Sequence, residues 1–285
     1  MTAATSRYPA PAKLNLFLHV VGRRADGYHL LQTVFRFIDY GDELAFRVRD
    51  DAVIRRTTQL AGVPEDGDLC VRAARLLQQH TGCRFGADIE LVKRLPLGGG
   101  LGGGSSDAAT TLIALNRLWK TGVPRDELQG LGLQLGADVP VFVFGRSAFA
   151  EGVGERLQEL VLRPAWYLVL MPEAAVSTAE IFSAAELTRN TNAITIAAFS
   201  TGPGHVFTGR NDLEPVVVRR YPQVARHLEW LRRYGDARMT GSGACVFCAF
   251  DSEAQAATVL SELPEGMRGF VARGLDRHPL WSGDE

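Results

Sequence analysis

Residues 96–109 read PLGGGLGGGSSDAA, with glycine at six of the seven positions from 98 to 104. The preceding residues 87–95 alternate between apolar and polar side chains, which is typical of a strand that ends at Pro96. A helical pattern follows, and Ser105-Ser106-Asp107 are residues that favour the N-cap of a helix. The stretch therefore predicts a strand, a glycine loop and a helix in succession.

Such a loop offers unhindered backbone N–H groups at the positive end of a helix dipole, which favours a bound anion and above all a phosphate. It does not match a Walker loop, because the required lysine would fall on Gly104 or Ser105. The dinucleotide pattern G-x-G-x-x-G occurs within 98–103, but so glycine-dense a run meets it by default. The acid expected with that pattern would fall near Asp126 or Glu127, in a polar helical stretch. A flexible loop without a ligand is the remaining alternative.

The composition is that of a folded globular protein of two domains. A chain of 285 residues and 31.0 kDa is long for a single hydrophobic core. Its content of 46% hydrophobic and 22% charged residues excludes a disordered or fibrous chain. The formal net charge is -1, from 31 basic and 32 acidic residues, so no general basic surface predicts binding to nucleic acid or to an anionic membrane. An anionic ligand therefore needs a local site.

No apolar stretch approaches the roughly 20 residues that span a bilayer, so neither a membrane segment nor a signal peptide is predicted. The four cysteines are too few and too irregularly spaced for a disulfide framework, which favours a cytoplasmic location. Cys245 and Cys248 form a C-x-x-C, but residues three apart in a strand face opposite sides, so we expect two core thiols. The sequence does not set the oligomeric state.

The order of elements predicts an α+β fold. In the first half, residues 13–21 alternate as a strand that places Lys13 and Asn15 on one face. A turn at Asp26-Gly27 leads to further strands and a helix, which we expect at 28–38, 43–48 and 69–79. After a polar stretch at 188–204, expected to be a long loop, the second half approximates a ferredoxin-like β-α-β-β-α-β order. Its elements are expected at 166–171, 223–233, 237–240, 244–250, 254–263 and 269–275.

Five segments, in order along almost the whole chain, resemble motifs of the GHMP small-molecule kinases: PAKLNL at 11–16, DGYH at 26–29, the glycine stretch at 96–109, GADVPVF at 136–142 and TGSGACVF at 240–247. The resemblance implies a ribosomal-protein-S5-like domain over 1–161, a ferredoxin-like domain over 162–285, a cleft between them and ATP-dependent phosphorylation of an alcohol. The glycine run is most similar to the branch that acts on a cytidine diphosphate alcohol of the non-mevalonate isoprenoid route. A kinase for homoserine or mevalonate is the alternative, and an RNA-binding module, suggested by the ribosomal-type fold, lacks a basic footprint.

The resemblance also implies the roles of two catalytic residues. Asp138 matches the base that takes the proton of the acceptor hydroxyl, and Lys13 matches the lysine that keeps this carboxylate ionised. From the residues alone, the alternatives are that Asp138 is a helix cap and that Lys13 is a solvated strand lysine. Both alternatives can be decided by the structure.

The same resemblance implies a donor site and an acceptor site. ATP, entering with Mg²⁺, would contact the loop and the strand before it, and a loop serine, Ser105 or Ser106, could touch the metal. The donor residues implied are Lys93, Pro96, Leu97, Gly98, Gly99, Gly100, Leu101, Gly102, Gly103, Gly104, Ser105 and Ser106. In the acceptor site, Tyr28 and Phe182 would flank the cytosine ring and His29 would hydrogen-bond its edge. The acceptor residues implied are Asn15, Tyr28, His29, Thr178, Phe182, Thr240 and Gly241.

Overall fold

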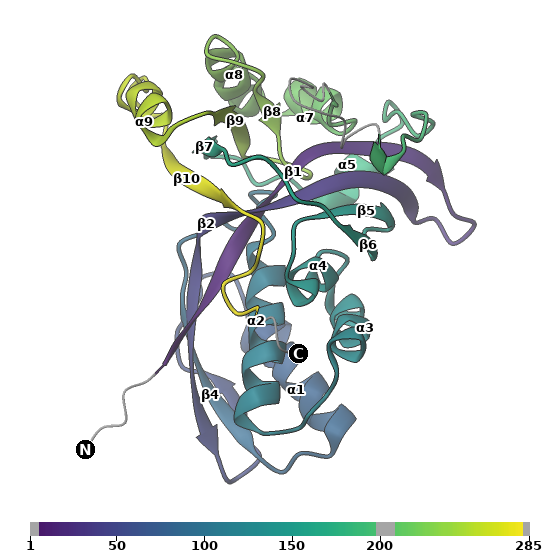
Figure 1. Cartoon of the computed structure of the whole chain (residues 1–285), viewed down its shortest axis with the longest axis vertical. Helices are drawn as coiled ribbons and strands as arrows, with labels where there is room; N and C mark the ends of the chain where they lie inside the picture. Colours follow the sequence, from purple (N-terminus) through teal and green to yellow (C-terminus); the bar gives the residue numbers. More distant parts are fainter. Residues whose placement is uncertain (1–5, 198–208, 282–285) are drawn as a thin grey trace.

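Two long antiparallel strands, β1 (Arg7–Arg23) and β2 (His29–Arg49), run through both halves of the molecule (Figure 1). The structure, a computed structural model, describes residues 6–197 and 209–281 of the chain. The separate strands expected at 28–38 and 43–48 are wrong, because β2 is continuous. It stays paired with β1 past Gly41, where a Cβ would lie 2.2 Å from the carbonyl oxygen of Ala10. Only glycine permits this close approach of the two backbones.

The lower half of Figure 1 is a sheet with helices packed on one face. β2 pairs with β4 (Gly86–Val92), and β4 pairs with the short β3 (Ile54–Arg56). The helical layer consists of α1 (Leu69–Thr81), α2 (Gly103–Leu118), α3 (Arg125–Leu135) and α4 (Val139–Phe144), with a 3₁₀ turn, η1 (Glu65–Gly67), before α1. Fully buried apolar side chains such as Phe37, Leu77 and Leu112 form the core between the layers.

Helix α2 begins at least three residues earlier than its sequence predicts. Its N-cap is Gly102, at a φ of 72°, and Ser105, Ser106 and Asp107 lie inside the first turns. The capping role expected of these three residues is therefore wrong. Because Gly102 supplies the left-handed backbone, the glycine loop itself turns the chain into the helix.

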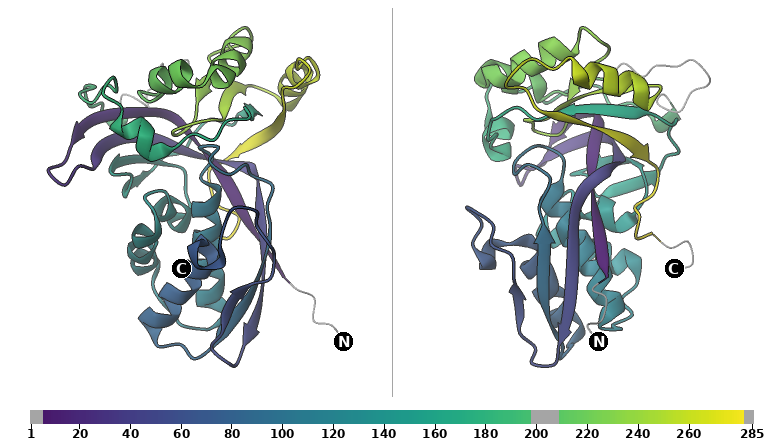
Figure 2. Two further views of the ribbon diagram at one scale, coloured as in Figure 1. Left: turned by 180° about the vertical axis from the view of Figure 1, so that it is seen from behind. Right: turned by 90° about the vertical axis from the view of Figure 1, so that its left-hand side faces the viewer.

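The upper half carries the second group of strands and helices. Its strands are β7 (Trp166–Leu170), β8 (Arg238–Met239), β9 (Val246–Phe250) and β10 (Gly269–Leu275). Its helices are α5 (Thr178–Ser183), α7 (Glu214–Arg220), α8 (Pro222–Leu231) and α9 (Glu253–Ser261). The ferredoxin-like succession of strands and helices is present here, with α8 and α9 on one side of the strands (Figure 2).

One sheet connects the two halves, in the order β3-β4-β2-β10-β7-β9-β8. The connection is the pairing of Leu275 in β10 with Phe37 in β2. Two further strands, β5 (Ala148–Gly152) and β6 (Arg156–Glu159), extend the sheet beside β2. The predicted domain boundary after residue 161 lies between β6 and β7 and stays a prediction.

Three smaller expectations can be compared with this fold. Cys245 and Cys248 are buried free thiols, as predicted, and burial raises the pKa of Cys245 to about 12. Of the loop expected at 188–204, residues 188–195 contain no helix or strand. Residues 196 and 197 are helical, contrary to the expectation, and 198–204 lie outside the described residues. Across the two described ranges, no helix is long and apolar enough to cross a membrane.

Candidate active site

The glycine loop is clamped between β1 and the turn that precedes β9. Gly100 has a φ of 72°, and a Cβ there would lie only 2.2 Å from the carbonyl oxygen of Thr240. The backbone N–H of Cys245 donates to Gly99 at 3.1 Å, and that of Lys13 donates to Leu101 at 3.0 Å. The loop is therefore held by backbone on both sides, which explains why position 100 has no room for a side chain.

A cavity of about 450 Å³ opens in front of this loop. Its wall includes every predicted donor residue except Ser106: Lys93, Pro96, Leu97, Gly98, Gly99, Gly100, Leu101, Gly102, Gly103, Gly104 and Ser105. Lys13, Asn15, Asp138, Thr178, Phe182 and Gly241 also line it. The structure thus brings the glycine loop, the first strand and the 136–142 motif to one cavity.

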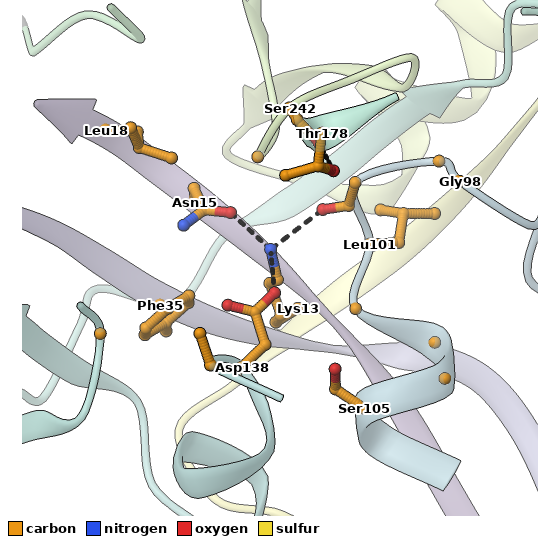
Figure 3. Close-up of a pocket in the computed structure, with 18 of the residues that line it drawn as sticks. Lys13, Asn15, Leu18, Phe35, Gly98, Leu101, Ser105, Asp138, Thr178 and Ser242 are labelled. Carbon is orange, nitrogen blue, oxygen red and sulfur yellow. Dashed lines mark hydrogen bonds and ion pairs between the residues drawn. The ribbon is translucent and has the colours of Figure 1, made fainter. Parts of the chain in front are cut away.

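Lys13 joins the glycine loop to Asp138 in this cavity (Figure 3). Its ammonium Nζ donates to the Gly100 carbonyl at 3.0 Å and to Asn15 Oδ1 at 2.6 Å, and it lies 3.2 Å from Asp138 Oδ2. The side chain is 2% exposed, so a solvated strand lysine is excluded. Asp138 stands at the N-cap position of α4 but makes no capping hydrogen bond, so its predicted alternative as a cap is excluded too.

Asn15 is held in place by a hydrogen-bond network behind the cavity wall. Its Nδ2 donates to Thr33 Oγ1 at 3.0 Å, which turns Oδ1 toward Lys13. Its backbone N–H donates to Thr240 Oγ1 at 3.0 Å. Thr240 is fully buried and does not line the cavity, unlike its neighbours Gly241 and Ser242. The position of Thr240 is therefore that of a support for Asn15 and the glycine loop.

Lys93 lies beneath the loop between two carboxylates. Its Nζ donates to Asp42 Oδ2 at 2.6 Å and to Asp107 Oδ2 at 2.8 Å. Asp42 also accepts the backbone N–H groups of Arg94 and Leu95 through Oδ1, whereas Asp107 Oδ1 has no hydrogen-bond partner among the described residues. Burial, with the nearby Asp42 charge, raises the pKa of Asp107 to about 8, against the attraction of Lys93. Sequence reasoning missed both carboxylates.

The two serines of the loop differ in their access to the cavity. Ser105 lines it (Figure 3). Ser106 is fully buried, and its Oγ has no hydrogen-bond partner among the described residues. Within the described part of the chain, no group of three or more His, Cys, Asp or Glu side chains is arranged to hold a metal ion. The donor set fits Mg²⁺ that arrives with phosphates, because such an ion keeps waters and needs only one or two protein oxygens.

A second cavity, of about 550 Å³, continues from the first past Thr178 and Phe182, which line both. Tyr28 and His29 line its far end. The His29 and Phe182 rings lie 5.0 Å apart at 32°, and Tyr28 is 64% exposed, so its ring is free to meet a ligand. All three aromatic residues predicted for the acceptor site therefore surround one cavity.

Two residues near this junction were not predicted. Ser242 Oγ lies 2.7 Å from Thr178 Oγ1, which joins the second glycine turn to α5 across the cavity (Figure 3). Arg189 hydrogen-bonds the ring of His29. Ser242 follows Gly241 in the 240–247 motif, so the sequence could have indicated it as an acceptor-site residue. Nothing in the local sequence distinguishes Arg189 from the other arginines.

Comparisons with known proteins point to one family. The family "GHMP kinases N terminal domain" matches residues 68–146, and "GHMP kinases C terminal" matches residues 203–269. A protein of Nitrosospira multiformis, named 4-diphosphocytidyl-2-C-methyl-D-erythritol kinase, is 64% identical over 275 residues, which cover 95% of this chain and 92% of the relative. The chain belongs to the 4-diphosphocytidyl-2-C-methyl-D-erythritol kinase family. A second member, from Thiobacillus denitrificans, is 65% identical over 96% of this chain and 97% of its own.

Solved structures support the same family. A crystal structure of 4-(cytidine 5'-diphospho)-2C-methyl-D-erythritol kinase matches with a TM-score of 0.81 and 33% identity, over 94% of this chain and 99% of the other. A homoserine kinase from Cytophaga hutchinsonii matches with a TM-score of 0.70 over 98% of this chain and 96% of the other, but only 15% identity. The second likeness shows the shared fold alone. The predicted family and α+β fold class are thus confirmed.

Proposed function

We propose that this chain transfers the γ-phosphoryl group of ATP to the 2-hydroxyl of 4-diphosphocytidyl-2-C-methyl-D-erythritol, in the non-mevalonate route to isoprenoid precursors. The name shared by relatives at 64% and 65% identity supports the substrate, and the GHMP kinase match supports ATP as donor. The low identity of the homoserine kinase gives that alternative no support. The four free cysteines are consistent with the expected cytoplasmic location.

One observation carries the proposed mechanism: the buried Lys13 ammonium contacts both the glycine loop and Asp138. The loop N–H groups and the start of α2 would hold the donor phosphates. The acceptor oxygen then forms a bond to the γ-phosphorus, the bond from that phosphorus to the β,γ-bridging oxygen breaks, and ADP leaves. Asp138 accepts the hydroxyl proton, and Lys13, 3.2 Å from Asp138 Oδ2, offsets the developing alkoxide charge.

Ser105 is the loop serine that we propose to hold Mg²⁺, because its side chain reaches the cavity and that of Ser106 does not. The ion would supply charge neutralisation at the transferred phosphoryl group. Removal of Mg²⁺ with a chelator should abolish turnover. The ferredoxin-like domain, proposed to start at residue 162, would contribute Thr178 and Gly241 to the cavity wall.

The test is an assay of ADP formation with three acceptors at equal concentration: 4-diphosphocytidyl-2-C-methyl-D-erythritol, homoserine and mevalonate. We expect turnover of the cytidine substrate alone, with a new phosphomonoester signal in the ³¹P spectrum of the product. Faster turnover of homoserine or mevalonate would contradict the proposal.

A further inference from the structure

Arg189 ties the segment that carries Phe182 to the start of β2. Its Nη2 donates to the carbonyl oxygens of Phe182 at 3.0 Å and Ala184 at 2.7 Å, and its Nη1 donates to that of Leu187 at 3.0 Å. Its Nε–H donates to His29 Nε2 at 3.1 Å across a sequence separation of 160 residues. Three carbonyls therefore fix the guanidinium so that one N–H points at the histidine ring.

This contact sets which nitrogen of His29 carries the proton. A guanidinium has donors and no acceptor, so Nε2 must present its lone pair to Arg189. Burial lowers the pKa of His29, and the charges of Arg189 and Arg23 lower it further, so the ring is neutral near pH 7. The single proton of a neutral ring must then sit on Nδ1. Among the described residues, Arg189 is the one hydrogen-bond partner of this ring.

We propose that Arg189 is a positioning residue for base selection, which holds His29 as the Nδ1–H tautomer so that the ring donates to cytosine and disfavours uracil. The inference rests on the proposed function for the class of ligand. Cytosine presents acceptors at N3 and O2, whereas uracil carries a hydrogen on N3, which would face the Nδ1–H donor to donor. A buried donor left without an acceptor loses its hydrogen bond without compensation.

The stacking geometry supports the same role. The His29 ring lies 5.0 Å from that of Phe182, and the main chain of Phe182 is bound by the same guanidinium. Arg189 thus controls both the proton on the histidine and the spacing between the histidine and the aromatic ring. Its guanidinium does not line the cavity, so it acts through His29 and Phe182 instead of touching the ligand.

The first test reads the tautomer directly, by ¹⁵N NMR of the full-length protein, with the His29→Gln variant used to assign the signal among six histidines. We expect a proton-bearing Nδ1 and a bare Nε2 in the wild-type chain. The Arg189→Met variant should lose this preference. Arg23→Met is the matched control, because Arg23 also lowers the pKa of His29 but donates to the Gly27 carbonyl. A wild-type ring protonated at Nε2 would overturn the proposal, and this measurement needs no folded variant of Arg189.

The second test compares the affinities of CDP and UDP by calorimetry. We expect the wild-type chain to prefer CDP, and the Arg189→Met variant to lose that preference by roughly 5-fold to 150-fold, the range for one unsatisfied donor. Arg189→Lys, which keeps the charge and a donor, should retain part of it. Equal binding of CDP and UDP by the wild type, or an unchanged ratio in a folded Arg189→Met variant, would overturn the inference.

The two proposals fail in different ways. A chain that prefers CDP through Arg189 but phosphorylates no cytidine substrate contradicts the proposed function and leaves the base-selection role standing. A chain that phosphorylates the cytidine substrate while Arg189→Met keeps the wild-type tautomer contradicts the base-selection role alone.

Discussion

The two ends of the cavity are built in opposite ways. At the donor end much of the wall is glycine backbone, packed so closely that a Cβ on Gly100 would overlap the Thr240 carbonyl, and Lys93 beneath it is held between two carboxylates. At the base end the wall is made of side chains, with Tyr28 64% exposed beside an open cavity. A phosphate cradle made of backbone has no side chains that can change, whereas specificity for a base can be changed one side chain at a time. The comparison predicts that substitutions at the donor end affect stability and function together, and that those at the base end affect binding alone.

The largest effect is expected on turnover, from a change at Asp138, which lies where the two ends of the cavity meet. Asp138→Asn should lower kcat by on the order of 10²-fold to 10⁴-fold, because the amide cannot accept the proton of the hydroxyl. The side chains are nearly equal in size, and Lys13 keeps its bonds to Asn15 and Gly100, so the melting temperature should hardly change. Steady-state kinetics measure kcat and thermal unfolding measures the melting temperature. The control is Asp126→Asn, a change at an exposed aspartate. Near-normal turnover would remove Asp138 from the mechanism.

At the donor end, Gly100→Ala and Gly98→Ala form a matched pair. Both glycines have a positive φ, 72° and 68°, but only the Cβ of the first would meet backbone, since the second faces open space. We expect Gly100→Ala to lower the free energy of unfolding by roughly 2–5 kcal/mol and to weaken ATP binding more than about tenfold. Gly98→Ala should cost only the backbone strain, about 1–2 kcal/mol. Denaturant unfolding measures the stability of each variant, and calorimetry measures its affinity for ATP. Equal effects of the two changes would contradict a loop held by close packing.

At the base end, Tyr28→Ala should raise KM for the cytidine substrate by roughly 5-fold to 150-fold, the value of one stacked aromatic ring. ATP affinity should stay within about twofold. Because Tyr28 is 64% exposed, the melting temperature should not fall. Tyr28→Phe serves as the control and should be mild. Should the melting temperature drop and both KM values rise together, Tyr28 would be a structural residue and the contrast between the two ends would not hold.

The smallest effect concerns the buried carboxylate under the glycine loop. The pKa of Asp107 is raised to about 8 in the folded chain, so between its ordinary value near 3.8 and 8 the folded state binds more protons than the unfolded state. Stability must then decrease as pH rises through this window. Relative to Asp107→Asn, the wild-type chain should lose unfolding free energy between pH 5 and pH 9, with most of the loss below pH 8. A constant difference across this range would indicate that Asp107 is ionised throughout.

The order of motifs along the chain was enough to predict the family, which the relatives confirm, and the α+β class. The errors lie where long-range contacts act on local patterns. The 28–38 and 43–48 strands merged because Gly41 packs against β1, and α2 began early because Gly102 adopts a left-handed conformation against Lys13 and Phe142. Neither contact can be read from a window of a few residues.

The residue types and their spacing were sufficient for the glycine loop and for the shared face of Lys13 and Asn15, because backbone freedom and the period of a strand are local properties. Only the tertiary structure decided which groups these residues meet. It put Thr240 behind Asn15 across 225 positions, Lys93 between two carboxylates, and Arg189 against His29 across 160. Each of these contacts joins residues from different elements, so its geometry depends on how those elements pack together and on no pattern within a single segment.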